Sequence, residues 1–294
     1  MKWDDYRQSD NLEDRRSGGG GRFGGMPGGR SGLGLGTMVV LGLVGYALGI
    51  DPRILIGGAE MLQGARAPTE QSRSAPGGKP SDDMGRFISV VLAQNEDVWT
   101  KVLPRDTGKA YEPPRLVLFR GVDRSGCGTA QAAMGPFYCP ADQRVYLDTS
   151  FFEEMKRKLG GGGDFAYAYV IGHEVGHHIQ NIMGILPRVN QMRERASERD
   201  ANALSVRVEL QADCFAGVWA YHIQQMGRLE QGDIEEAMST ATAIGDDRLQ
   251  KAGQGYAVPD SFTHGSAEQR TRWFLAGFKS GSLKSCDTFS TRAL

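Results

Sequence analysis

Two histidines and a glutamate in the pattern H-E-x-x-H are the residues of this sequence best suited to chemistry. His173, Glu174 and His177 lie in a helix-like stretch that contains no proline. Histidines four residues apart project from one helical face, so both imidazoles can reach a single metal ion. Two nitrogens and one carboxylate suit zinc and leave a position for water, whose proton Glu174 can accept. The pattern therefore predicts one zinc ion per chain, with Glu174 as the catalytic base.

A third protein ligand has to come from elsewhere in the chain. The metzincin extension would need glycine and histidine where Gln180 and Met183 stand, so that class is excluded. Glu209 and Asp213 are four residues apart in a segment with an apolar helical pattern, which places both on one face. We predict that Glu209 is the third ligand and that Asp213 hydrogen-bonds the far nitrogen of a zinc histidine, which fixes its tautomer. An ordinary solvated helix carboxylate is the alternative for Glu209.

The elements that must position these residues follow from periodicity and capping signals. A helix is expected at 81–102, and short strands are expected at 115–119, 136–139 and 144–147. After four glycines, Asp164 is placed to cap a helix that contains the H-E-x-x-H pattern, and the remaining chain is helical in pattern. The sequence therefore predicts an α+β fold that is mainly helical, with a small antiparallel sheet.

The first eighty residues differ from the rest in composition. Residues 1–32 are rich in glycine and arginine with little to bury, so we expect them to be disordered. The next 18 residues, 33–50, carry no charge and approach the length that crosses a bilayer. They predict one transmembrane helix; a buried soluble helix and a signal peptide cleaved at Gly49 are the alternatives. Residues 51–80 have linker composition, which leaves 81–294 as one folded domain.

Charged residues around the apolar stretch predict its orientation. Before the stretch stand Arg15, Arg16, Arg22 and Arg30, whereas only Arg53 follows it closely. The positive-inside rule then predicts a cytoplasmic N-terminus and a large domain outside the cytoplasm, on the periplasmic side of a bacterial inner membrane.

The cysteines agree with an extracytoplasmic domain. The chain has four, and all follow the apolar stretch: Cys127, Cys139, Cys214 and Cys286. An even number in an oxidising compartment indicates two disulfides, for which three pairings exist. We expect Cys127 to pair with Cys139 across a short loop and Cys214 to pair with Cys286. No C-x-x-C spacing supports a cysteine zinc site.

Taken together, these residues resemble the gluzincin, or thermolysin-like, metallopeptidases. The whole chain is more closely similar to the bacterial putative neutral zinc metallopeptidase family. The resemblance implies a zincin-like peptidase domain at 81–294, held by one membrane anchor. It covers nearly all of the chain and rests on the segments 1–7, 135–140, 172–180, 209–217, 244–247 and 264–277.

For several further residues the sequence allows two interpretations of their role. In thermolysin-like enzymes a late histidine or tyrosine donates to the oxyanion, and the resemblance gives that catalytic role to His264, with loop stabilisation as the alternative. His264 lies just before a helix that Ser266 and Gln269 are expected to cap. His178 and His222 are expected to be structural. Tyr138 and Tyr146 belong either to the core or to an edge strand where a peptide substrate adds.

The preferred function is a membrane-anchored zinc endopeptidase, a hydrolase whose partners are the membrane and a peptide or protein substrate. The alternative is a non-catalytic binding or quality-control module of the cell envelope, in which zinc is a structural staple and His264 a fourth ligand. A secreted soluble protease differs only in location. Because 34 basic residues face 35 acidic ones, bulk charge excludes a nucleic-acid binder.

Overall fold

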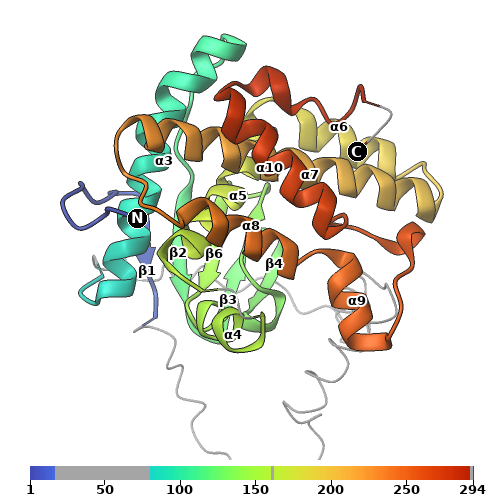
Figure 1. Cartoon of the computed structure of the whole chain (residues 1–294), viewed down its shortest axis with the longest axis horizontal. Coiled ribbons are helices and arrows are strands. Elements are labelled where there is room, and N and C mark those ends of the chain that lie inside the picture. The colour runs from blue at the N-terminus through green and yellow to red at the C-terminus, as the bar shows by residue number, and fades with distance from the viewer. Residues whose placement is uncertain (17–79, 160–161, 292–293) are drawn as a thin grey trace, which may run out of the picture.

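The computed structural model describes residues 1–16, 80–159, 162–291 and 294 (Figure 1). The described part is mainly helical with small sheets, as an α+β fold requires. Its α-helices are α3 (Asp83–Thr107), α4 (Ser150–Leu159), α5 (Asp164–Ile182), α6 (Ile185–Arg193), α7 (Glu198–Gln225), α8 (Asp233–Ala243), α9 (Asp246–Gln254) and α10 (Ala267–Ser280). Its strands are β1 (Leu12–Asp14), β2 (Arg115–Phe119), β3 (Val122–Ser125), β4 (Gly128–Gln131), β5 (Phe137–Cys139) and β6 (Arg144–Asp148).

The main sheet is mixed, which corrects the expectation of a small antiparallel sheet. Its strand order is β1-β2-β6-β5; β1 and β6 both run parallel to β2, and β5 alone is antiparallel to its neighbour. The antiparallel hairpin β3–β4 forms a separate sheet. The prediction of an antiparallel sheet failed because β2 and β6 are not joined by a direct turn. The chain leaves the main sheet after β2 to form the β3–β4 hairpin, and β6 then lies parallel to β2.

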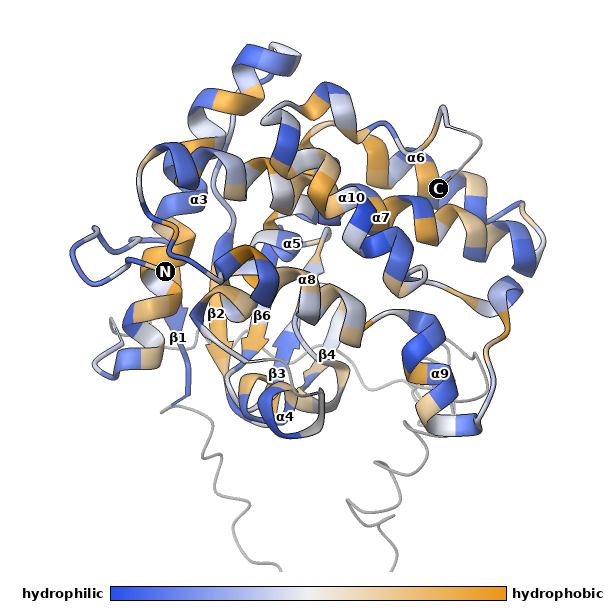
Figure 2. Cartoon of the chain, in the orientation of Figure 1, coloured by the Kyte–Doolittle hydropathy of each residue, from blue (hydrophilic) through white to orange (hydrophobic). Residues whose placement is uncertain are grey.

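Alternation along the central strands divides the interior into two cores. Leu116 and Leu118 of β2 face the main core, under the helices. Val117 and Phe119 face a smaller core that also holds Tyr146 of β6. Because successive side chains of a strand point to opposite faces and both faces are buried here, the middle residues of β2 and β6 are mostly apolar, and these strands appear largely orange in Figure 2.

The helix α5 lies near the middle of the molecule, where it packs against α7, and α10 packs against α7 in turn (Figure 1). The crossing of α7 and α10 depends on two glycines that face each other's backbone. A Cβ on Gly217 would lie 2.0 Å from the Phe274 carbonyl oxygen, and one on Gly277 would lie 1.9 Å from the Cys214 carbonyl oxygen. The two backbones are therefore too close for any larger residue, and this contact carries α10 over the middle of α7.

The first sixteen residues correct the prediction of disorder for 1–32. Residues Leu12–Asp14 form β1, which pairs with β2, and Ser9 and Leu12 are buried. The folded unit therefore includes an N-terminal strand as well as 81–294. The prediction failed because a three-residue strand contributes almost no local hydrophobic pattern. Residues 17–32 lie outside the described part.

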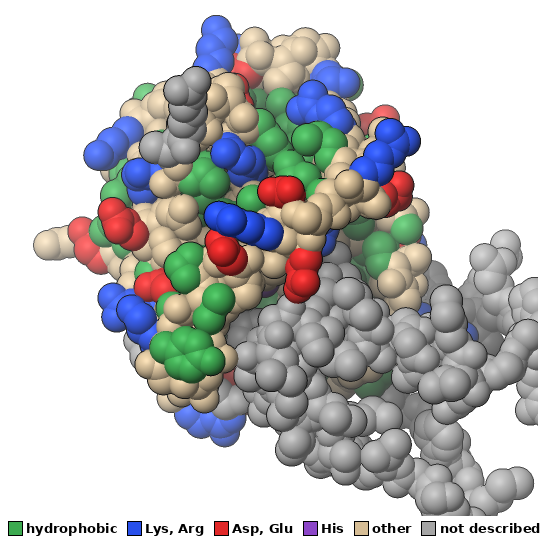
Figure 3. Space-filling model, turned by 90° about the vertical axis from the view of Figure 1, so that its right-hand side faces the viewer, with side chains coloured by type: hydrophobic (Ala, Val, Ile, Leu, Met, Phe, Trp, Pro, Cys, Tyr) green, Lys and Arg blue, Asp and Glu red, His purple; other side chains and the backbone are tan. Residues whose placement is uncertain are grey.

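The predicted anchor, 33–50, and nearly all of the predicted linker also lie outside the described residues. Among the helices that are described, none combines the length and apolar character needed to cross a bilayer. On the face of the molecule shown in Figure 3, basic and acidic side chains are interspersed, as 34 basic and 35 acidic residues lead one to expect.

Both disulfide pairings are confirmed. Cys127 pairs with Cys139, which ties the turn of the β3–β4 hairpin to β5. Cys214 pairs with Cys286, which ties α7 to the C-terminal segment. The expected capping box at Ser266 is also present. Asp164, however, is the first residue of α5 and not its cap; its carboxylate accepts a hydrogen bond from the Trp3 indole instead.

Candidate metal centre

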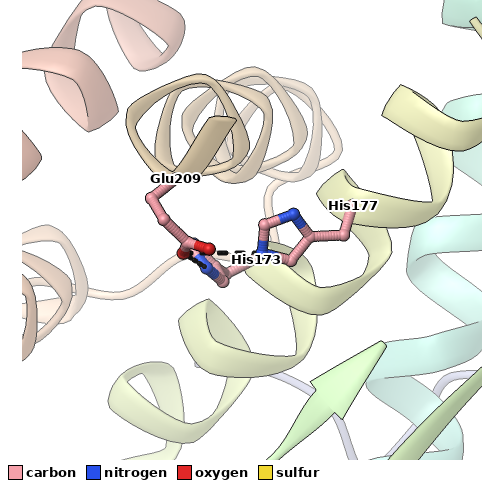
Figure 4. Close-up of side chains that lie close together, drawn as sticks. All are labelled: His173, His177 and Glu209. Atoms are coloured by element: carbon pink, nitrogen blue, oxygen red, sulfur yellow. Dashed lines mark hydrogen bonds and ion pairs between the residues drawn. The ribbon is translucent and has the colours of Figure 1, made fainter. Parts of the chain in front are cut away.

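Two neighbouring helices bring the three predicted ligands together. Figure 4 shows Glu209 of α7 reaching toward His173 and His177 of α5. The Glu209 Oε2 atom lies 3.1 Å from His173 Nε2 and 3.5 Å from His177 Nε2. One ligand atom from each residue lies within 4.8 Å of the other two. Two imidazole nitrogens and a carboxylate oxygen are the donor set that zinc takes in hydrolases, so these residues fit the metal.

The helices meet closely because the H-E-x-x-H pattern contains Gly176. A Cβ on this glycine would lie 3.0 Å from the Ala212 carbonyl oxygen and 3.2 Å from the Ala212 Cα. Both contacts are tight, and both are with the backbone of α7, which has little room to move. The glycine between the two histidines thus lets α7 approach until Glu209 reaches both imidazoles.

Asp213 holds His173 as predicted, one turn of α7 beyond Glu209. Its carboxylate is fully buried and lies 2.8 Å from His173 Nδ1. It also accepts hydrogen bonds from the Tyr169 hydroxyl at 2.6 Å and from Arg270 Nε and Nη2 at 2.8 and 2.9 Å. An ionised carboxylate can only accept, so His173 carries a proton on Nδ1, and its Nε2 is turned toward Glu209.

Gln180 holds His177 in a comparable way. Its Oε1 atom lies 2.9 Å from His177 Nδ1. Its Nε2 donates to the Val208 carbonyl at 2.7 Å and to Gln211 Oε1 at 3.1 Å, which fixes the amide with its oxygen toward the histidine. His177 therefore also carries its proton on Nδ1 and presents Nε2 to the site.

Three of these supporting residues were not predicted from the sequence. Gln180 entered only to exclude the metzincins, although its spacing of three from His177 puts it on the same helical face. Tyr169, four residues before His173, carried a similar signal. Arg270 carried none, because it reaches the site from α10, 57 residues after Asp213.

The pKa values of the site show that its carboxylates stay ionised. Burial alone would raise the pKa of Asp213, but Arg270 and His173 lower it to about 2. Burial would likewise raise the pKa of Glu209, but the imidazoles of His177 and His173 hold it well below its usual range. For His173 burial lowers the pKa, yet Asp213 and Glu209 raise it to about 10. The pocket thus stabilises positive charge beside Glu209, as a cation site must.

Glu174 is placed differently from the ligands. Its side chain is 7% exposed, next to His173 on α5. Among the described residues, its carboxylate makes no hydrogen bond or ion pair, and it does not belong to the group of three ligands. Glu174 is therefore a largely buried residue, next to His173 in the sequence, whose carboxylate has no hydrogen-bond donor in the described part of the chain.

His264 lies near the ligands without joining them. Its Nδ1 is 3.0 Å from Thr263 Oγ1 and 3.3 Å from Asp246 Oδ1, while Asp246 Oδ2 accepts three consecutive backbone amides of residues 263–265. Burial lowers the pKa of His264, but the Asp246 carboxylate and the charge of Glu209 raise it. The loop thus favours the protonated form of His264 and holds its imidazole close enough to Glu209 for the two charges to interact.

The other histidines have structural partners. His178 Nδ1 lies 3.0 Å from the Tyr138 hydroxyl, and its Nε2 lies 2.6 Å from the Glu112 carbonyl oxygen. His222 Nε2 lies 2.9 Å from the Gly281 carbonyl oxygen. Tyr138 is buried in the main core and Tyr146 in the smaller core, so both tyrosines are core residues, as one of the two interpretations expected.

The chain is similar to known proteins along most of its length. The Escherichia coli protein described as "Uncharacterized protein YpfJ" is 50% identical over 293 residues, covering 98% of this chain and 99% of the relative. An uncharacterized protein of Mycobacterium tuberculosis is 41% identical over 227 residues, covering 72% of this chain and 74% of the relative. No solved structure matches significantly. The family model described as "Putative neutral zinc metallopeptidase" matches residues 1–289.

Proposed function

Because the chain belongs to the putative neutral zinc metallopeptidase family, we propose that it is a zinc-dependent endopeptidase that hydrolyses peptide bonds. The observation that carries the proposal is the three-donor group His173, His177 and Glu209. Catalytic zinc sites use three protein ligands and keep one position for water or substrate, whereas structural sites use four.

Zinc held by these three residues would supply a Lewis acid that polarises a carbonyl and makes water more acidic at neutral pH. The protein prepares the site for the ion in two ways. Asp213 and Gln180 hold both histidines through Nδ1, so that Nε2 is turned toward Glu209 and would bind the ion once it is deprotonated. The buried carboxylates then balance the charge of the cation.

Glu174 is the proposed general base. Glu174 follows His173 on α5, and its carboxylate is unpaired among the described residues, so it is available to accept a proton from the attacking water. The same carboxylate then returns the proton to the nitrogen of the leaving amine, which restores its charge for the next cycle.

Two further features suit a peptide substrate. The strand β5 lies at one edge of the described main sheet, where an extended peptide can add by backbone hydrogen bonds. His264, held by Asp246, is the proposed donor to the oxyanion that forms on the scissile carbonyl. Both assignments follow from the peptidase proposal and fail if it fails.

The competing function is a non-catalytic module that keeps zinc as a staple. It requires a fourth protein ligand, and His264 was the candidate. Among the described residues, the group of potential ligands contains three members, and His264 is not one of them. The site therefore favours the peptidase.

We also propose that the domain works outside the cytoplasm, in the bacterial envelope. The two disulfides support this location, because disulfides persist in oxidising compartments and are rare in the cytosol.

Peptidase activity can be tested on the full chain, purified from an oxidising compartment and loaded with zinc. Wild type and Glu174→Gln would be incubated with casein and with a mixture of unstructured peptides, and new termini would be counted by mass spectrometry. The proposal expects cleavage by wild type only, with zinc retained in both proteins. Cleavage by Glu174→Gln at the wild-type rate would overturn the role of Glu174. A zinc-loaded wild type that cleaves none of the peptides would favour the binding module.

A further inference from the structure

The N-terminal segment Met1–Arg16 is built into the same sheet as the rest of the domain. Leu12, Glu13 and Asp14 are in parallel register with residues 116–118 of β2. The Leu116 amide donates to the Asn11 carbonyl at 2.9 Å, and the Arg15 amide donates to the Leu118 carbonyl at 2.8 Å. Figure 1 shows β1 beside α3 and β2. The backbone of the segment therefore completes hydrogen bonding at one edge of the main sheet.

Side chains of the segment also neutralise a buried group of the domain. Glu96 of α3 is 7% exposed, and its carboxylate accepts from Ser9 Oγ at 2.5 Å, Asn11 Nδ2 at 2.8 Å and Arg7 Nη2 at 2.8 Å. Among the described residues, all hydrogen-bond donors to Glu96 come from the N-terminal segment. A buried carboxylate is costly without partners, so α3 and the segment stabilise each other.

The two ends of the intervening chain are joined by an ion pair. Arg16, the last described residue before the gap, donates to Asp82 with Nη2 to Oδ2 at 2.5 Å. Asp82 in turn caps α3 by accepting from the Gly85 amide at 2.9 Å. The chain thus leaves the domain and re-enters it at the same place.

We propose that residues 1–16 and the metal-binding domain occupy the same side of any membrane that the protein meets. A bilayer has a hydrocarbon core about 30 Å thick, which cannot separate strands that share a hydrogen-bonded ladder. A single crossing between residues 16 and 80 is therefore incompatible with this fold. Nor does the sequence offer a return crossing, because 51–79 contains seven charged residues and no second uncharged run of 18. The expected cytoplasmic N-terminus with an extracytoplasmic domain is thus replaced by a one-sided arrangement.

Two single-cysteine reporters test the arrangement in the full chain. All four native cysteines are in disulfides, so an introduced cysteine is the one free thiol. Gln8→Cys reports on the N-terminal segment and Lys251→Cys on the domain; both positions are exposed. Spheroplasts expressing each variant would be treated with a membrane-impermeant maleimide, before and after lysis with detergent.

The proposal expects both reporters to be labelled from the same side. Labelling of both in intact spheroplasts supports the proposal and the extracytoplasmic location. Labelling of both only after lysis supports the one-sided arrangement but overturns that location. Labelling of one reporter before lysis and the other only after it overturns the proposal. None of these outcomes depends on zinc or on peptidase activity.

A second measurement tests whether the segment is docked in solution. Hydrogen exchange of the purified full chain would be followed in peptides covering 9–16 and Leu116. We expect slow exchange in wild type, loss of that protection in Glu96→Ala, and wild-type protection in Glu194→Ala, an exposed control. Exchange of 9–16 in wild type at the rate of an unstructured peptide would overturn the docking on which the inference rests.

Discussion

The two ligand histidines are held by chemically different surroundings. His173 hydrogen-bonds an ionised carboxylate, Asp213, which is itself paired with Arg270 in the interior. His177 hydrogen-bonds a neutral amide, Gln180, whose own partners are a backbone carbonyl and another amide. Both arrangements hold the imidazole through Nδ1 and turn Nε2 toward Glu209. The centre therefore holds His173 by a charged group and His177 by a neutral dipole.

This difference separates orientation from electrostatics. An amide orients an imidazole but adds no net charge, so its loss costs hydrogen bonds alone. A buried carboxylate also makes the imidazole more basic. Because Asp213 contacts both His173 and Arg270, the charge of this imidazole also depends on the buried ion pair. Breaking such an ion pair from one end leaves an uncompensated charge. The His173 side should therefore affect both folding and metal affinity, and the His177 side mainly affinity.

The largest expected effect is that of Arg270→Met. The substitution leaves the fully buried Asp213 without its cation, which should lower the free energy of unfolding by about 3–5 kcal/mol. Urea unfolding of the full chain measures it. Arg272→Met, an exposed position on the same helix, should change stability by less than about 0.5 kcal/mol. Equal effects of the two substitutions would contradict a structural role for the buried pair.

Asp213→Asn should have the larger effect on metal binding. Asparagine keeps the size of the side chain but removes the charge that makes His173 more basic. We expect zinc affinity to fall by about 100-fold, at the upper end of the range for residues that support metal ligands. Competition with a zinc-binding dye measures it, with Asp4→Asn as the exposed control. An unchanged zinc Kd would show that the charge of Asp213 does not act on the metal.

Gln180→Met tests the neutral side. Methionine fills a similar volume but cannot accept from His177 Nδ1. Zinc affinity should fall by about tenfold, the lower end of the same range, because orientation is lost without a change of charge. The same dye competition applies, with Gln191→Met on α6 as control. A loss greater than that of Asp213→Asn would reverse the proposed difference between the two sides.

The smallest expected effect is that of Tyr169→Phe. It removes one donor to Asp213, while Arg270 still holds the carboxylate in place. Stability should fall by about 1 kcal/mol and zinc affinity should stay at the wild-type value. Thermal unfolding and dye competition measure the two, and Tyr256→Phe is the exposed control. A tenfold loss of zinc affinity would show that Tyr169, and not Arg270, positions Asp213.

The sequence predicted the parts of the centre that depend on helical spacing. His173, His177, Glu209 and Asp213 each have a partner four residues away on their own helix, and this spacing survives folding unchanged. Arg270 could not be found this way, because its contact depends on how α10 crosses α7. The disulfide pairings were predicted correctly because the two loops they close differ so much in length.

The fold was predicted where hydrophobic patterns are long and missed where they are short. The helix bearing His173 and the strand at 115–119 are both strongly apolar and were expected. The strand at 12–14 was missed, since three residues among charged neighbours carry no periodic signal, and its partner lies about one hundred residues away. The proposed one-sided arrangement rests on that single missed pairing.

The most direct test of the metal centre is the zinc content of the purified full chain, wild type beside Glu209→Ala and the exposed control Glu194→Ala. Plasma mass spectrometry after exhaustive dialysis gives the zinc-to-protein ratio. We expect one zinc per chain in wild type and in the control, and a marked loss in Glu209→Ala, because two histidines alone bind zinc weakly. A wild type without zinc, or a Glu209→Ala protein that retains a full equivalent, would show that these three residues do not form a zinc site.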